Sequence, residues 1–111
     1  MIYQHRNLAS GQWFKLSLME QLANVGAEIG RAINWRKKGN KDYSEQAFWR
    51  GLELLSLSLD DQKNRGARLK ELCRLYEVLG DFFVGKNEYG SSDELWEKYF
   101  LFFNWAARRK A

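Results

Sequence analysis

The stretch that decides the fold is residues 17–59, which read SLMEQLANVGAEIGRAINWRKKGNKDYSEQAFWRGLELLSLSL. Apolar residues recur in it at intervals of three and four, a spacing typical of amphipathic helices. Ser17 and Glu20 have the spacing of a capping box, and Gly39 interrupts the apolar pattern before a second acidic start at Asp42. The stretch therefore predicts two helices joined by a short turn.

Helical spacing continues to the C-terminus, without proline and without strand-like alternation. We expect four helices, over residues 12 or 17 to 38, 42–59, 64–84 and 91–109. Connections this short favour antiparallel neighbours. The sequence thus predicts an all-α protein, an antiparallel up-down-up-down four-helix bundle, with residues 1–12 as an N-terminal arm. Gly26 and Gly30 are expected opposite Gly51, where they would let the first two helices pack closely.

Size and composition indicate a single domain. The chain has 111 residues, of which 45% are hydrophobic, and this is enough for one core but not for two. Its only cysteine, Cys73, excludes an internal disulfide and fits a reducing cytoplasm, and its position beside Leu72 favours a buried thiol. No apolar run is long enough to cross a membrane. We therefore expect one cytoplasmic domain over residues 1–111.

The helix expected over 91–109 carries more aromatic side chains than one buried face can hold. Each ring alone fits a core position, but the whole set favours a second buried face. That face could be covered by another copy of the chain, by a partner protein or by stacked bases. We expect a homo-oligomer. The residues predicted to form its interface are Trp96, Phe100, Phe103 and Trp105.

The net charge of +4 is modest, so the placement of the charges matters more than their sum. The helix expected over 64–84 begins with bases and ends with acids, which is the reverse of what a helix dipole favours. An antiparallel bundle would place this start beside the end of the last helix. The bases at that end also have an ordinary explanation, because basic residues are favourable at any helix C-terminus. The resulting basic end favours a polyanionic partner. Its predicted phosphate contacts are Lys63, Arg65, Arg68, Lys70, Arg74, Arg108 and Arg109. At the other end of the bundle, bases such as Arg36 and Lys37 are expected to face acids such as Asp93 and Glu97.

Residues typical of catalysis are missing from the sequence. The only histidine, His5, falls in the expected arm, and no zinc-protease, phosphate-loop, dinucleotide or serine-hydrolase motif occurs. The pair Asp60 and Asp61 could hold a divalent ion, but a pair between two helices more often caps the second helix. We therefore expect no enzymatic activity, no catalytic residue, no metal and no cofactor.

Residues 21–57 resemble the central hairpin of bacterial four-helix bundle proteins that include the ribosomal-RNA intervening-sequence proteins and the accessory proteins of diversity-generating retroelements. The similar features are a QL start, small residues before an Ile-x-x-x-Ile step, a basic loop, a lysine-acid-aromatic step and a leucine-rich second helix. Residues 75–81, LYEVLGD, are similar to that family's third-helix turn, whereas INWRK at 33–37 replaces its Asn-Ile-Ala-Glu-Gly segment. The resemblance implies a ring-like homo-oligomer, often pentameric in the accessory proteins, that engages nucleic acid or a reverse transcriptase.

Two functions are compatible with these patterns. The first is a non-enzymatic, oligomeric accessory protein that binds DNA or RNA through the basic end. The alternative is a protein-interaction adaptor or antitoxin-like partner that docks another protein through the aromatic face of the last helix. The oligomeric state of the isolated chain distinguishes the two, because an adaptor without its partner would expose that face.

Overall fold

The computed structural model describes residues 11–109, which form a short 3₁₀ helix and four α-helices. The 3₁₀ helix is η2 (Trp13–Lys15), and the α-helices are α1 (Leu18–Lys37), α2 (Lys41–Asp60), α3 (Ala67–Phe83) and α4 (Asp93–Arg109). No strand occurs in this part of the chain. The predicted all-α class and the four helices are confirmed.

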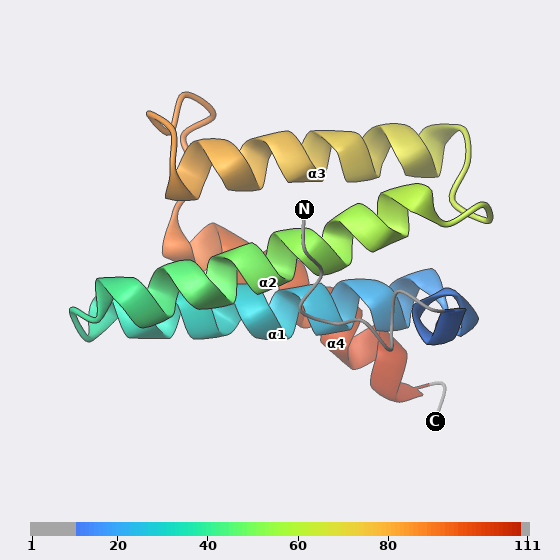
Figure 1. Ribbon diagram of the computed structural model, residues 1–111, viewed down its shortest axis with the longest axis horizontal. Helices are drawn as coiled ribbons and strands as arrows, with labels where there is room; N and C mark the ends of the chain where they lie inside the picture. Colours follow the sequence, from blue (N-terminus) through green and yellow to red (C-terminus); the bar gives the residue numbers. More distant parts are fainter. Residues whose placement is uncertain (1–10, 110–111) are drawn as a thin grey trace.

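Three of the helices lie lengthwise in the order α1, α2, α3, with α2 in the middle, and α4 packs on α1 (Figure 1). Figure 1 shows that α4 crosses α1 obliquely and that its C-terminal end lies on the opposite side of the α1–α2 pair from α3. A regular up-down-up-down arrangement is therefore not confirmed. The helix that follows α3 in the chain packs mainly on α1.

The central helix, α2, is buried over most of its circumference. All five residues from 51 to 55 are buried, and they span more than one turn. A helix that is buried all round belongs to the core of a protein. Here α1, α3 and η2 all contact α2.

Trp13 of η2 is part of this core, which the sequence did not indicate. Its side chain is fully buried, and its Nε1 donates a hydrogen bond to Ser58 Oγ at 3.1 Å. The arm expected over residues 1–12 lies, up to residue 10, outside the described residues, and Gln12 directly precedes η2. The chain is therefore anchored on α2 five residues before α1 begins.

The glycines pack differently from the prediction. A Cβ on Gly51 would lie 2.9 Å from Ile29 Cδ1, so α1 and α2 do approach closely at this glycine. A Cβ on Gly26 would instead lie 2.7 Å from Cβ of Phe100, and one on Gly30 would meet nothing within 4 Å. The prediction that Gly26 and Gly30 face Gly51 is wrong, because Gly26 lies on the face of α1 that α4 covers.

Local sequence was sufficient for the start of α1 but not for the starts of α2 and α3. The Ser17 capping box is present as predicted, with both reciprocal hydrogen bonds. The side chain of Asn40, not that of Asp42, caps α2 by accepting from the backbone of Tyr43 at 3.0 Å. α3 starts at Ala67, three residues later than expected, because Asn64 is held in a buried network.

Candidate nucleic-acid and partner-binding surfaces

A buried polar network fixes the connection between α2 and α3. Gln21 of α1 is fully buried and donates from Nε2 to Asp61 Oδ2 at 2.7 Å and to the carbonyl of Trp13 at 3.2 Å. Asn64, also buried, donates to the carbonyl of Ser58 at 2.9 Å and to Gln21 Oε1 at 3.3 Å. Because buried polar groups are costly to leave unpaired, this network holds the start of α3 in place.

Asp61 is the acid of this network. Burial on its own would raise the pKa of Asp61, but hydrogen bonds from the Lys63 ammonium, from Gln21 and from the Lys63 backbone lower it below its ordinary value. Lys63 Nζ also donates to the carbonyl of Phe14 at 3.0 Å. Asp61 therefore belongs to a structural ion pair, not to a cap on α3, and Lys63 is only partly available to a ligand.

The start of α3 carries positive charge that no acid neutralises. Its N-cap is Gly66, which has no side chain to accept from the first backbone N–H groups, and its first turn contains no acidic residue. Arg65, Arg68 and Lys70 are exposed, and none of the ion pairs within residues 11–109 involves them. The N-terminal end of a helix already carries partial positive charge, so these bases and the helix dipole add. The arrangement is suited to binding an anion.

Arg74 lies two turns further along α3. Its guanidinium carbon is 5.8 Å from the centre of the Tyr89 ring. The loop that carries Tyr89 is itself held by Asp81, whose carboxylate accepts from the backbone of Glu88 at 2.9 Å and of Tyr89 at 3.1 Å. Arg74 is therefore oriented towards the loop that follows the C-terminal end of α3.

The bases at the end of α4 are not brought together with those of α3. Figure 1 shows the end of α4 and the start of α3 on opposite sides of the α1–α2 pair. The guanidinium of Arg109 lies 4.7 Å from the centre of the Trp105 ring, and Arg108 borders a groove against α1. The single basic end expected from a regular bundle is therefore divided into two separate clusters, because α4 crosses α1 obliquely.

At the opposite end of the molecule, basic residues of α1 pair with acidic residues of α4, as predicted. Arg36 pairs with Asp93 at 2.6 Å and Lys37 with Glu97 at 3.1 Å, which joins the end of α1 to the start of α4. The hydrogen bond and the charge of Glu97 raise the pKa of Lys37. Arg36 and Lys37 are thus paired with acids, whereas no ion pair among the described residues involves the three bases Arg65, Arg68 and Lys70 at the start of α3.

The four aromatic residues predicted to form an interface divide into two groups. Trp96 and Phe100 are each only 6% exposed and pack in the core, where their rings stack with centroids 5.9 Å apart. These two are therefore not available to a partner. Phe103 is half-buried, and Trp105 is 54% exposed.

A second apolar set on α4 was missed by the sequence analysis. Leu95, Leu101 and Phe102 are 58%, 63% and 54% exposed. The spacing of Leu95 and Phe102 relative to Trp105 is a signal that could have identified these two, because the three residues repeat at seven and three on one face. The exposed face of α4 is therefore centred on Phe102 and Trp105 and lies away from Trp96 and Phe100.

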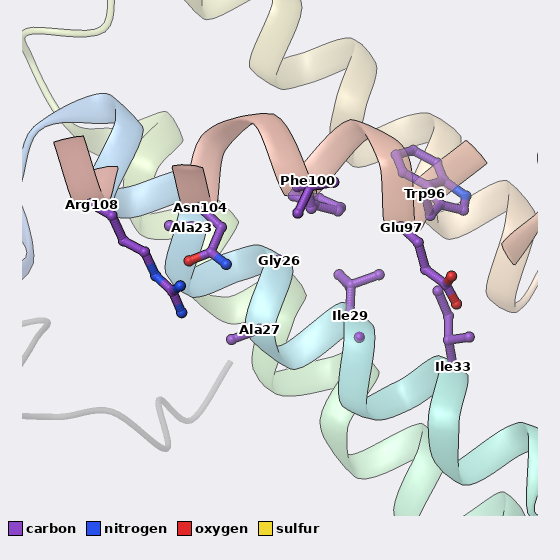
Figure 2. A pocket seen from close by; sticks show the side chains of 12 residues that line it. Ala23, Gly26, Ala27, Ile29, Ile33, Trp96, Glu97, Phe100, Asn104 and Arg108 are labelled. Carbon is purple, nitrogen blue, oxygen red and sulfur yellow. The ribbon is translucent and has the colours of Figure 1, made fainter. Parts of the chain in front are cut away.

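A groove of about 400 Å³ runs between α1 and α4 (Figure 2). Small residues of α1, among them Ala23 and Ala27, form its floor, and Glu97, Asn104 and Arg108 project from α4 along it. Glu97 is already paired with Lys37, so Arg108 is the one charged side chain of the lining without an ion pair among the described residues. The lining contains no residue pair suited to acid–base or nucleophilic chemistry.

Other predicted sites can be placed as well. His5 lies outside the described residues, and within residues 11–109 no group of three or more His, Cys, Asp and Glu could hold a metal ion.

Cys73 is exposed, so its assignment to the core is wrong. α3 packs mainly on α2, and Cys73 lies beyond the face that α2 covers. None of the helices that the structure describes is long and apolar enough to cross a membrane.

Neither the fold nor these surfaces can be assigned by similarity. The chain matches no family model, no curated protein and no solved structure.

Proposed function

We propose that this protein is a non-enzymatic, oligomeric nucleic-acid-binding protein of the cytoplasm that contacts phosphates through the start of α3. The observation that carries the proposal is the uncompensated charge of Arg65, Arg68 and Lys70 around the uncapped N-terminus of α3. Contacts of this kind neutralise phosphates and do not read base edges. Binding to DNA or RNA should therefore be strongly salt-dependent and nearly independent of sequence.

The buried network behind this surface supports the proposal. Asn64 and Asp61 hold the backbone on the N-terminal side of Arg65, so the basic side chains start from a fixed position. A fixed origin lowers the entropy that is lost when a flexible side chain is immobilised on a ligand. Arg108 and Arg109 could extend the contact only along a second, separate surface.

The test replaces Arg68 and Lys70 by glutamate and measures binding to a labelled mixed-sequence oligonucleotide by fluorescence anisotropy. The matched control, Lys38→Glu with Lys41→Glu, makes the same change in net charge at the turn between α1 and α2. We expect the α3 variant to lose binding and the control to keep most of it. For the native chain, affinity should fall with a log–log salt slope of about −2 to −3, because each contacted phosphate contributes about 0.7 to 0.9. Equal binding by the two variants would remove the assignment.

A second candidate function is supported by a different observation. The exposed apolar residues of α4 favour a protein–protein contact, as expected for an adaptor that docks another protein. A chain that remains monomeric and binds a hydrophobic dye would favour this adaptor. A defined oligomer that excludes the dye would argue against it.

A further inference from the structure

One face of α4 has the spacing of a helix–helix seam. Leu95, Lys98, Phe102 and Trp105 are all exposed and alternate at three and four residues, which is the repeat of the two inner positions of a coiled coil. Trp96 and Phe100 lie on the opposite side of the helix, against α1. α4 thus has one face packed inside the chain and a second face suited to another helix.

The charges beside this seam are distributed unevenly along α4. Acidic residues lie in the first turns and basic residues in the last turn. Asp93 and Glu97 already pair with α1, whereas no ion pair within residues 11–109 involves Glu94 or Arg108. Glu94, Leu101 and Arg108 are spaced by seven residues, so all three flank the same side of the seam.

We propose that α4 pairs with α4 of a second copy of this chain in an antiparallel, two-fold arrangement. In the register that brings opposite charges together, Glu94 pairs with Arg108 of the partner subunit, and by symmetry the pair forms twice. Leu95 then lies against Trp105 of the partner subunit, and Lys98 lies over Phe102 of the partner subunit as a cation–π contact. Leu101 meets Leu101 of the partner subunit beside the two-fold axis.

A parallel pair is disfavoured by the same residues. In a parallel seam each inner position faces its own counterpart, so Lys98 would lie against the partner's Lys98 in the centre of the interface. Two like charges removed from water at close range are strongly unfavourable. The parallel alignment would also leave Glu94 and Arg108 without each other, because both would lie at the same end as their counterparts.

The surface next to the seam has a recess for one of the larger side chains. A groove of about 360 Å³ between α3 and α4 is lined by Leu75, Val78, Leu95 and Tyr99, among others. It lies at the Leu95 end of α4, where the antiparallel register places Trp105 of the partner subunit. Exposed aromatic side chains that enter such apolar pockets are typical anchors of protein interfaces.

This inference rests on the oligomeric part of the proposed function and is independent of its nucleic-acid part. The mass of the particle is measured without nucleic acid, and the charge reversal at Arg68 and Lys70 leaves the seam intact. A native chain without a dimer would therefore overturn this inference but not the phosphate contacts of α3. Loss of oligonucleotide binding would overturn those contacts but not the dimer.

The first experiment is light scattering on a sizing column with the full chain over a range of concentrations. We expect a mass of twice 13.1 kDa. Phe102→Glu should give a folded monomer, because Phe102 is 54% exposed and contributes little to its own core. The control Val84→Glu, at a residue 62% exposed outside the seam, should remain dimeric. A native chain that is monomeric at every concentration would refute the dimer and favour another protein as the occupant of this face.

The second experiment tests the register by exchanging charges. Glu94→Arg and Arg108→Glu should each weaken the dimer, because each puts like charges opposite each other across the interface. The double exchange should restore the dimer. Circular dichroism on each variant checks that α4 remains helical. A dimer whose stability is unchanged by either single exchange would overturn this register. An oligomer of higher order, such as a pentamer, would overturn it as well.

The third experiment tests direction with a short bis-maleimide cross-linker in a Cys73→Ser background, because Cys73 is exposed. In the antiparallel pair Leu101→Cys should cross-link to its counterpart beside the axis, whereas Leu95→Cys should not. Leu95→Cys should instead cross-link to Trp105→Cys when the two variants are mixed. Cross-linking of both single variants to themselves would show a parallel pair.

Discussion

α1 and α3 are amphipathic helices of similar length, yet they contribute to this molecule in different ways. α1 lies between α2 and α4, and it buries seven residues. α3 packs mainly on α2, and its buried residues are Leu72, Leu75 and Leu79. Because burial of apolar surface is the main source of stability, most of the folding free energy should come from the α1 side.

The pairing of charged side chains also differs between α1 and α3. Glu28 of α1 is buried and contacts both Arg31 and Arg50, so its carboxylate is neutralised inside the structure. At the start of α3, by contrast, Arg68 and Lys70 are exposed and unpaired among the described residues. Of these two helices, α3 buries fewer residues, and it is the one whose basic residues have no acidic partner among the described residues.

The largest loss of stability should come from a cavity-forming substitution in the core on the α1 side. Ile29→Ala removes a side chain that is 1% exposed, and we expect a loss of about 2–5 kcal/mol in the free energy of unfolding. Val78→Ala on α3 removes a half-buried side chain and should cost less than half as much. Urea unfolding followed by circular dichroism measures both values. Equal losses of unfolding free energy in the two variants would contradict the larger contribution of the α1 side to stability.

The glycines provide a matched set of smaller changes. Gly26→Ala should destabilise the protein by about 1–3 kcal/mol, because the added methyl group would overlap the side chain of Phe100. Gly30→Ala, one turn further along α1, and Gly80→Ala on α3 meet nothing within 4 Å. Each should instead stabilise its helix by about 0.5–1 kcal/mol. Thermal unfolding of the three variants is the measurement. A stabilised Gly26→Ala would show that α4 does not approach α1 closely.

The Asp61 network predicts a dependence of stability on pH. The pKa of Asp61 is lowered in the folded protein, so the unfolded chain binds this proton more readily. The stabilisation is therefore complete above the unfolded pKa of about 4 and is lost as the pH falls through the lower folded pKa. Asp61→Asn should unfold more easily at neutral pH, and the difference from the native chain should shrink in acid. A difference that does not change with pH would contradict this role of the carboxylate.

The smallest expected effect is a change in the pKa of Tyr99, which lies where α3 and α4 meet. Burial, and secondarily the charge of Glu71, raise the pKa of Tyr99 to about 12. Since the folded protein holds this proton more tightly, its contribution to stability is present below pH 10 and is lost as the pH rises towards 12. Glu71→Gln should lower the Tyr99 pKa slightly, which an absorbance titration of the phenol can detect against a Tyr99→Phe control. An unchanged titration would place Glu71 too far from Tyr99 to act.

Part of the exposed basic surface was predictable from local sequence. The run from Lys63 to Arg74 opposes the helix dipole, and this conflict pointed to the start of α3 before any packing was known. Whether Trp96 and Phe100 or Leu95 and Phe102 face outwards could not be predicted in the same way. Both pairs have helical spacing, and only the side on which α1 packs distinguishes them.

The sequence by itself determined the four helices and the Ser17 cap. Only the tertiary structure decided that α4 crosses α1, that Trp13 enters the core and that Cys73 is exposed. The reason is physical: helical periodicity specifies which residues share a face. Which neighbour covers that face depends on how side chains from distant segments fit together.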